Sequence, residues 1–146
     1  MSLQNLLQIK QLEAHKSNAA QVNRLLDSSV RCLEDARQES ITPETRLEAG
    51  YRAIMQLSMV SLWANGYRPT TSSGHHVTMI QSLVHSIGLD ADQMRVLDTF
   101  RVKRNSTNYT GEDIDIASVE ACIEAGEHLL QQVRHWLQNN RPDLIQ

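Results

Sequence analysis

Two arginines and two asparagines follow one another along one side of a predicted helix near residue 100. Arg101, Arg104, Asn105 and Asn108 continue an apolar face, which includes Leu97, at spacings of three or four residues. Core packing does not explain such a face, because arginine is rarely buried without a partner. The planar guanidinium group suits phosphates and carboxylates. These residues therefore form a candidate anion-binding site.

In this site, Arg101 and Arg104 would contact a phosphodiester or a nucleotide phosphate, and Asn105, Asn108 and Tyr109 would add hydrogen bonds. With an ordinary pKa near 10, a tyrosine is a poor general base at neutral pH, although it can donate a hydrogen bond or serve as a modification target. This interpretation expects the protein's own acids to leave both guanidinium groups unneutralised. In the alternative interpretation, the arginines offset the helix dipole and pair with nearby acids, and the tyrosine packs over the next turn.

A pair of histidines, His75 and His76, follows Gly74 at an expected helix start. Adjacent histidines do not share a helix face, and no cysteine or carboxylate lies at ligand spacing, so the sequence predicts no metal site. The two rings and the free amides of a helix start could bind an anion, or the pair could simply be loop structure. Motifs for a cofactor, a phosphate loop or a nucleophilic serine are absent, so nothing in the sequence supports a standard hydrolase or oxidoreductase.

The elements that must position these residues are all predicted helices, with no internal repeat. Local signals fix several helix starts, including a capping box at Asn18 and a Thr42 cap followed by Pro43. The segment from Ala53 to Ala64 is apolar or small nearly all round, so we expect its helix to be central. The predicted helices cover residues 2–14, 18–38, 42–65, 75–87, 90–109 and 113–138, and a tail breaks away at Pro142.

The bulk composition is that of one globular domain, residues 1–146, with the bundle over 18–138 and a tail over 139–146. Hydrophobic residues make up 40% and charged residues 21%, and no apolar run approaches a membrane span. The first residues lack a signal-peptide pattern, so we expect a cytoplasmic protein. The net charge of −3 argues against indiscriminate DNA coating but leaves room for a local basic patch. Cys32 and Cys122 are expected to be buried, unpaired thiols.

Taken together, these features resemble the HEPN superfamily of all-α proteins. The resemblance rests on Arg101-x-x-Arg104-Asn105-x-x-x-Tyr109 and on a central helix followed by Ala64-Asn-Gly-Tyr-Arg-Pro69 and Gly74-His-His76, and it covers roughly residues 18–138. It implies an antiparallel helical bundle, usually a homodimer whose facing motifs line a shared cleft. Many members are metal-independent ribonucleases with an Arg-x4–6-His motif. Others bind nucleotides, or act as a toxin or as the partner of a nucleotidyltransferase, and a tyrosine just past the histidine can be adenylylated.

This sequence departs from that motif at the histidine. Tyr109 stands after Arg104 and four intervening residues, and Asn108 stands after Arg101 and six. Three hypotheses follow. The protein is a dimer that binds RNA or a nucleotide without turnover; it is a ribonuclease toxin that uses His75 or His76 instead; or it is a structural bundle that grips a protein, such as a nucleotidyltransferase or an antitoxin. The apolar central helix also favours dimerisation.

Overall fold

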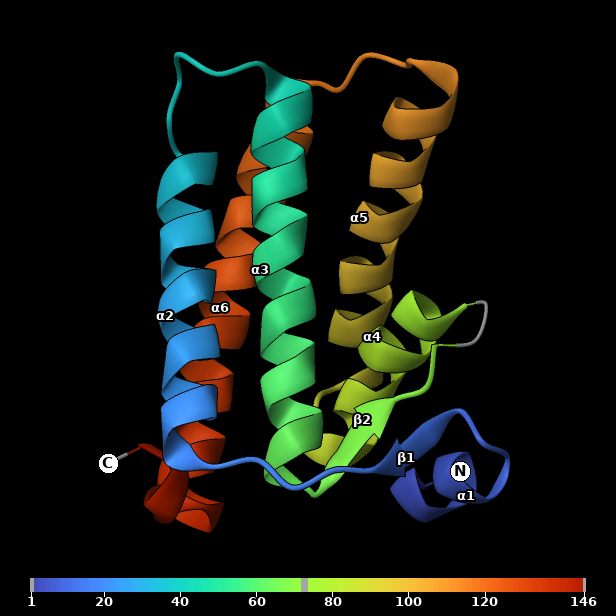
Figure 1. The fold of residues 1–146 in the computed structure, drawn as a ribbon. Helices are drawn as coiled ribbons and strands as arrows, with labels where there is room; N and C mark the ends of the chain where they lie inside the picture. Colours follow the sequence, from blue (N-terminus) through green and yellow to red (C-terminus); the bar gives the residue numbers. More distant parts are fainter. Residues whose placement is uncertain (1, 72–73, 146) are drawn as a thin grey trace.

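The computed structural model describes residues 2–71 and 74–145, and in these the chain forms a helical bundle (Figure 1). The predicted fold class, an all-α antiparallel bundle with a few main and several short helices, is confirmed. The elements are α1 (Leu3–Gln8), β1 (Leu12–Ala14), α2 (Ala19–Ala36), α3 (Pro43–Ala64), β2 (Tyr67–Pro69), α4 (His75–Ser86), α5 (Ala91–Thr110), α6 (Ile116–Asn140) and a 3-10 turn (Pro142–Ile145).

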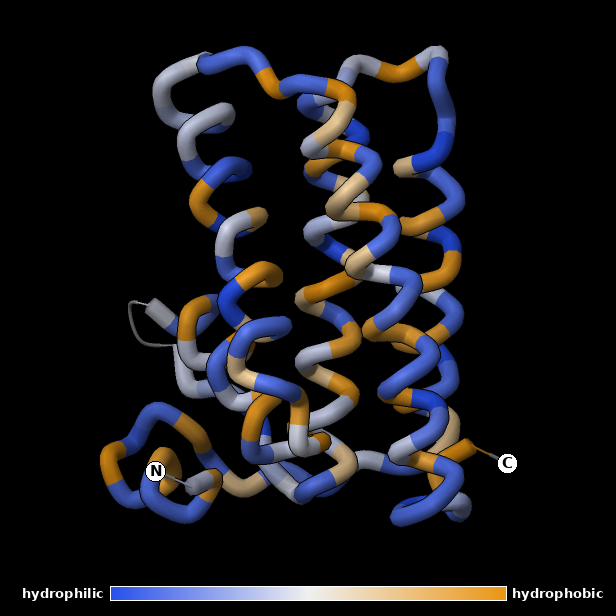
Figure 2. The backbone as a smooth tube through the Cα atoms, turned by 180° about the vertical axis from the view of Figure 1, so that it is seen from behind, coloured by the Kyte–Doolittle hydropathy of each residue, from blue (hydrophilic) through white to orange (hydrophobic). Residues whose placement is uncertain are grey.

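The four long helices run alternately up and down, and α3 occupies the middle, in contact with α2, α4, α5 and α6 (Figure 1). Ala53, Ile54, Leu57 and Val60 of α3 are all 0% exposed. The helices show alternating hydrophobic and hydrophilic bands, as amphipathic helices around a shared core must (Figure 2). The prediction that α3 is central is therefore confirmed. Within the part of the chain that the structure describes, no helix combines the length and apolarity needed to cross a membrane.

Local chemistry sets the helix starts as predicted. Asn18 and Gln21 exchange side-chain bonds with each other's backbone N–H in a reciprocal capping box. Thr42 accepts the amide of Thr45 ahead of Pro43 in the first turn of α3. The side chain of Asp90 also caps α5, but it forms no reciprocal box, because the Gln93 side chain bonds to Gln132 of α6 instead.

The predicted helix over residues 2–14 is wrong in its second half. Helix α1 ends at Gln8, Lys10 adopts a left-handed φ of 63°, and the chain then continues as β1. This strand pairs antiparallel with β2, with Leu12 opposite Pro69, although the sequence predicted helices as the only elements. Leu12 is buried by this pairing. The partner lies more than fifty residues away, so no local pattern could indicate it.

The tail after Pro142 packs against the bundle, contrary to the prediction that it breaks away. The 3-10 turn contacts α2 and α6, and Leu144 is buried. The Nη1 of Arg141 donates to the carbonyl oxygen of Ala64 at 2.8 Å, which satisfies the end of α3. The burial of Leu144 and the hydrogen bond from Arg141 therefore fix the tail against the bundle.

The end of α2 depends on a buried arginine. Arg46, in the first turns of α3, donates from Nε to the carbonyl oxygen of Ala36 at 2.7 Å. The last carbonyls of a helix have no partner within the helix, so this bond satisfies a group that burial would otherwise leave unpaired. Cys32 and Cys122 are buried free thiols, as predicted.

Candidate functional site

The first turn of α4 and the C-terminal half of α5 form one pocket, with a volume of about 410 Å³. Gly74, with a left-handed φ of 81°, turns the chain into α4 and sets its histidines against α5. Six of the seven site residues predicted from the sequence line this pocket: His75, His76, Arg101, Arg104, Asn105 and Tyr109. We call this the α4–α5 pocket. The two histidines thus lie beside the two arginines, as the ribonuclease hypothesis required.

A carboxylate from the central helix holds Arg104. The Nε and Nη2 of Arg104 donate to the two carboxylate oxygens of Glu48 at 2.9 and 3.2 Å. Asn108, the seventh predicted residue, turns toward the same carboxylate, with its Nδ2 at 3.5 Å, rather than into the pocket. The bond from Arg104 is the main cause that holds the pKa of Glu48 below its ordinary value.

Arg101 is held within its own helix. Its Nε and Nη2 donate to the carboxylate of Asp98 at 2.7 and 3.2 Å, one turn earlier. With Arg104 paired to Glu48, both guanidinium groups are neutralised by internal acids, and the expectation that they are unneutralised is wrong. The physical reason is burial: the side chains of Arg101 and Arg104 are only 22% and 24% exposed, and a cation so far removed from water needs a partner.

A tyrosine of α3 underlies the α4–α5 pocket. The hydroxyl of Tyr51 lies 2.9 Å from Nδ1 of His76, and the guanidinium carbon of Arg104 lies 5.5 Å from the centre of the Tyr51 ring. Tyr51 is 2% exposed, and burial raises its pKa to about 12, so the phenol stays protonated. Burial, helped by the nearby cations, lowers the pKa of His76. His76 is therefore a neutral imidazole at neutral pH.

The remaining predicted residues lie at the rim. The ring of His75 meets that of His76 edge to face, with ring centres 4.7 Å apart. Tyr109 is 81% exposed, so it does not pack over the following turn as one interpretation supposed. Asn105 accepts a bond from Nη1 of Arg104 at 3.3 Å, which leaves its amide N–H groups for other partners.

Sequence reasoning missed Glu48 and Tyr51. Both lie on α3, three residues apart, so they share a helix face. Their shared face on a helix expected to be central was the available signal, because a carboxylate and a phenol that packing covers need polar partners on a neighbouring helix. Arg104 and His76 are those partners.

The charges in the α4–α5 pocket balance. Two guanidinium groups face two carboxylates, and the neutral His76 adds no charge. Among the described residues, Nη1 of Arg101 has no hydrogen-bond partner, so its N–H groups remain available. The pocket therefore offers oriented donors rather than a strong positive field.

No protein-family model and no curated protein matches this chain. The resemblance to the HEPN superfamily therefore stays a prediction.

Proposed function

We propose that this protein is a HEPN-like dimer whose α4–α5 pocket binds a phosphate group of RNA or of a nucleotide. One observation carries the proposal: guanidinium groups from α5 and imidazoles from the start of α4 converge on one pocket of about 410 Å³. A phosphate would accept bonds from the N–H groups of Arg101 and Asn105. Arginine and neutral N–H donors are the usual phosphate ligands in proteins.

The internal ion pairs hold the donors in place in this proposal, and they also weaken the site. Glu48 and Asp98 orient the two guanidinium groups before a ligand arrives, which lowers the ordering cost of binding. Their negative charge also repels an incoming phosphate, so the affinity is modest. A partner protein, such as an antitoxin or a nucleotidyltransferase, is part of the proposal by resemblance alone.

The test is the binding of fluorescent 5′-AMP and of a short labelled RNA to wild type, Arg101→Gln and Asp98→Asn. Loss of a charge-assisted bond is worth roughly 1.5–3 kcal/mol, so Arg101→Gln should weaken binding about tenfold or more. Asp98→Asn removes the competing charge and should strengthen binding. Arg134→Gln, at an exposed position of α6, is the control with the same charge change. Equal affinities in all four proteins would refute the proposal.

A second candidate is metal-independent RNA cleavage, which the position of His76 favours. In the tautomer in which Nδ1 carries the proton and donates to Tyr51, Nε2 is an open proton acceptor beside two arginines. Cleavage should then persist in EDTA and fall roughly 100-fold or more in His76→Gln. The acidic limb of its rate profile should lie below pH 6.5, because the pKa of His76 is lowered. RNA that stays intact under these conditions would refute cleavage, and phosphate binding would be the remaining proposal.

Dimerisation is tested separately. Sedimentation at micromolar concentration should give twice the 16.5 kDa mass of one chain. A single 16.5 kDa species would remove the shared cleft from the proposal, while the α4–α5 pocket of each chain would remain.

A further inference from the structure

A second pocket, of about 400 Å³, lies between α2 and α3. It shares no residue with the α4–α5 pocket. Its lining combines one aromatic ring, two arginines, two small polar side chains and a leucine: Trp63, Arg24, Arg31, Gln21, Ser28 and Leu25. We call it the Trp63 pocket.

The indole of Trp63 forms a supported aromatic platform. On one side it packs against the ring of His15, with ring centres 5.5 Å apart and planes tilted by 36°. His15 is itself fixed by a bond from its backbone N–H to the carbonyl oxygen of Gly66 at 2.9 Å. Trp63 is only partly buried, and it also lines the pocket. A ring that is held by the protein and still reachable is suited to stack against a planar ligand.

Two arginines beside this platform differ from those of the α4–α5 pocket. Arg24 and Arg31 are seven residues apart on α2, so they lie on one face, and both are exposed. Neither arginine takes part in an ion pair among the described residues. Asp27 lies one turn from each on α2, and Glu34 lies one turn beyond Arg31.

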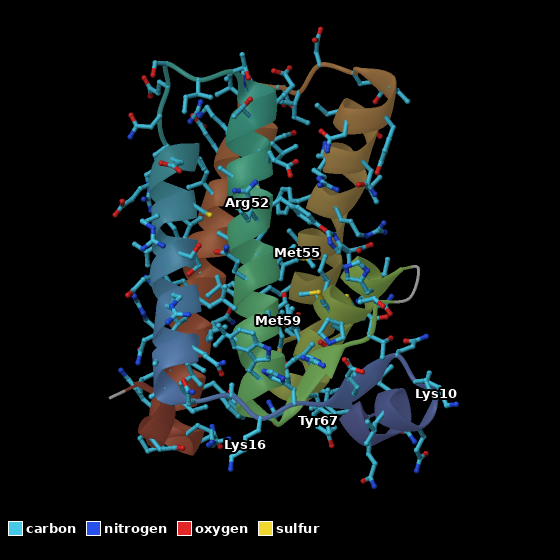
Figure 3. All side chains as sticks on the ribbon, in the orientation of Figure 1. Lys10, Lys16, Arg52, Met55, Met59 and Tyr67 are labelled. Atoms are coloured by element: carbon cyan, nitrogen blue, oxygen red, sulfur yellow. The ribbon has the colours of Figure 1, made fainter. Side chains whose placement is uncertain are left out.

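The surroundings of the pocket add further cations. Lys16, before α2, and Arg52, on α3, lie along these two helices in the view of Figure 3. Arg52 and Arg31 both lie near enough to the thiol of Cys32 to lower its pKa, and Asp35 opposes them there.

Neutral donors complete the lining. The side-chain oxygen of Gln21 accepts the backbone N–H of Asn18 at 3.2 Å, which leaves its amide N–H groups for a ligand. The hydroxyl oxygen of Ser28 accepts a bond from Gln56 at 2.9 Å, which fixes Ser28 at the pocket wall.

We propose that the Trp63 pocket binds a nucleoside phosphate, with the base stacked on the indole of Trp63 and the phosphate between Arg24 and Arg31. A planar ring flanked by cations matches a base joined to a phosphate. Free nucleotides and single-stranded RNA share this chemistry.

This proposal goes beyond the α4–α5 pocket and does not depend on it. Tyr51, under that pocket, and Trp63 are twelve residues apart on α3, about 18 Å along the helix at 1.5 Å per residue. One mononucleotide therefore occupies only one of the two pockets, and each can fail alone.

The experiment follows the fluorescence of Trp63 in a Trp136→Phe background, where it is the sole tryptophan. The probes are AMP, ribose 5-phosphate and a tetra-adenylate RNA. The expected result is saturable quenching by AMP and an affinity for ribose 5-phosphate that is about 5- to 150-fold lower, because stacking is worth roughly 1–3 kcal/mol per base. A tetra-adenylate affinity well above that of AMP identifies RNA as the source, and equal affinities identify the free nucleotide.

The variants Arg24→Gln and Arg31→Gln, combined, change only exposed side chains and should weaken AMP binding about tenfold or more. Arg134→Gln should have no effect, and Asp27→Asn should strengthen binding. The Arg101→Gln variant should leave AMP quenching of Trp63 unchanged, which separates this proposal from the α4–α5 pocket. The proposal for the Trp63 pocket would be overturned by any of three results. These are no quenching by AMP, quenching that survives the double substitution, and quenching by an acidic peptide alone.

Discussion

Replacement of Glu48 by glutamine tests whether the ion pair with Arg104 is structural, functional or both. The substitution keeps the shape of the side chain and one carbonyl acceptor. It removes the negative charge of the carboxylate that accepts both hydrogen bonds from Arg104. Arg104 then stays partly buried above Tyr51 without its counter-charge. We expect a less stable protein that binds phosphate more tightly.

The magnitude follows from the exposure of the pair. The side chains of Arg104 and Glu48 are 24% and 31% exposed, between a surface pair and a buried one. Surface pairs are worth roughly 0–1 kcal/mol, and breaking a buried pair costs about 3–5 kcal/mol. Glutamine retains one bond, so the free energy of unfolding should fall by about 1–2 kcal/mol, and the melting temperature by roughly 3–8 °C for a chain of this size.

The sign of the pH dependence is also fixed. The pKa of Glu48 in the folded protein is below the ordinary 4.5, so its contribution to stability is present above about pH 4.5 and is lost as the pH falls through the lower folded value. The stability difference between wild type and Glu48→Gln should therefore be constant from pH 5 to 8 and shrink below pH 4.5.

Urea denaturation at several pH values measures this difference. Glu120→Gln, at an exposed position of α6, removes one negative charge without touching the ion pair and should leave stability nearly unchanged. A Glu48→Gln protein as stable as wild type at pH 7, or a difference that grows as the pH falls, would refute the reasoning.

Three further predictions concern stability. Arg46→Ala should lower the free energy of unfolding by about 1–3 kcal/mol in urea denaturation, because it leaves the buried Ala36 carbonyl without its bond. In an NMR titration, the imidazole of His76 should titrate below pH 6.5. Because this pKa is lowered in the folded protein, the free energy of unfolding should decline as the pH falls below about 6.5, and His76→Gln should remove that decline. Leu144→Ala should cost about 2–4 kcal/mol by thermal denaturation, whereas a tail that merely hangs from the bundle would make it neutral.

The parts of the fold that the sequence predicted well are those set by neighbouring residues. Asn18 and Thr42 cap helices because their side chains reach amides three residues ahead. The central position of α3 followed from its apolar circumference. The pairing of β1 with β2 and the burial of Leu144 depend instead on partners that are distant in the sequence, which a periodic pattern does not encode.

The same distinction between local and distant partners applies to the candidate site. The spacing on α5 correctly predicted that Arg101, Arg104 and Asn105 share a face. The approach of His76 depends on how α4 packs against α5, and the partner of Arg104 comes from α3, 56 residues earlier. Asp98 was visible three residues before Arg101, so that part of the neutralisation could have been predicted.

The two pockets should differ in how salt affects them, and this difference shows which one holds an RNA strand. In the α4–α5 pocket, Asp98 and Glu48 already balance the arginines, so a phosphate displaces few counterions there. Arg24 and Arg31 have no such acid in contact among the described ion pairs. For single strands, each phosphate contact adds about 0.7 to the slope of log affinity against log salt. Replacing both arginines by glutamine should therefore reduce the slope by about 1.4, and an unchanged slope would mean that the strand bypasses the Trp63 pocket.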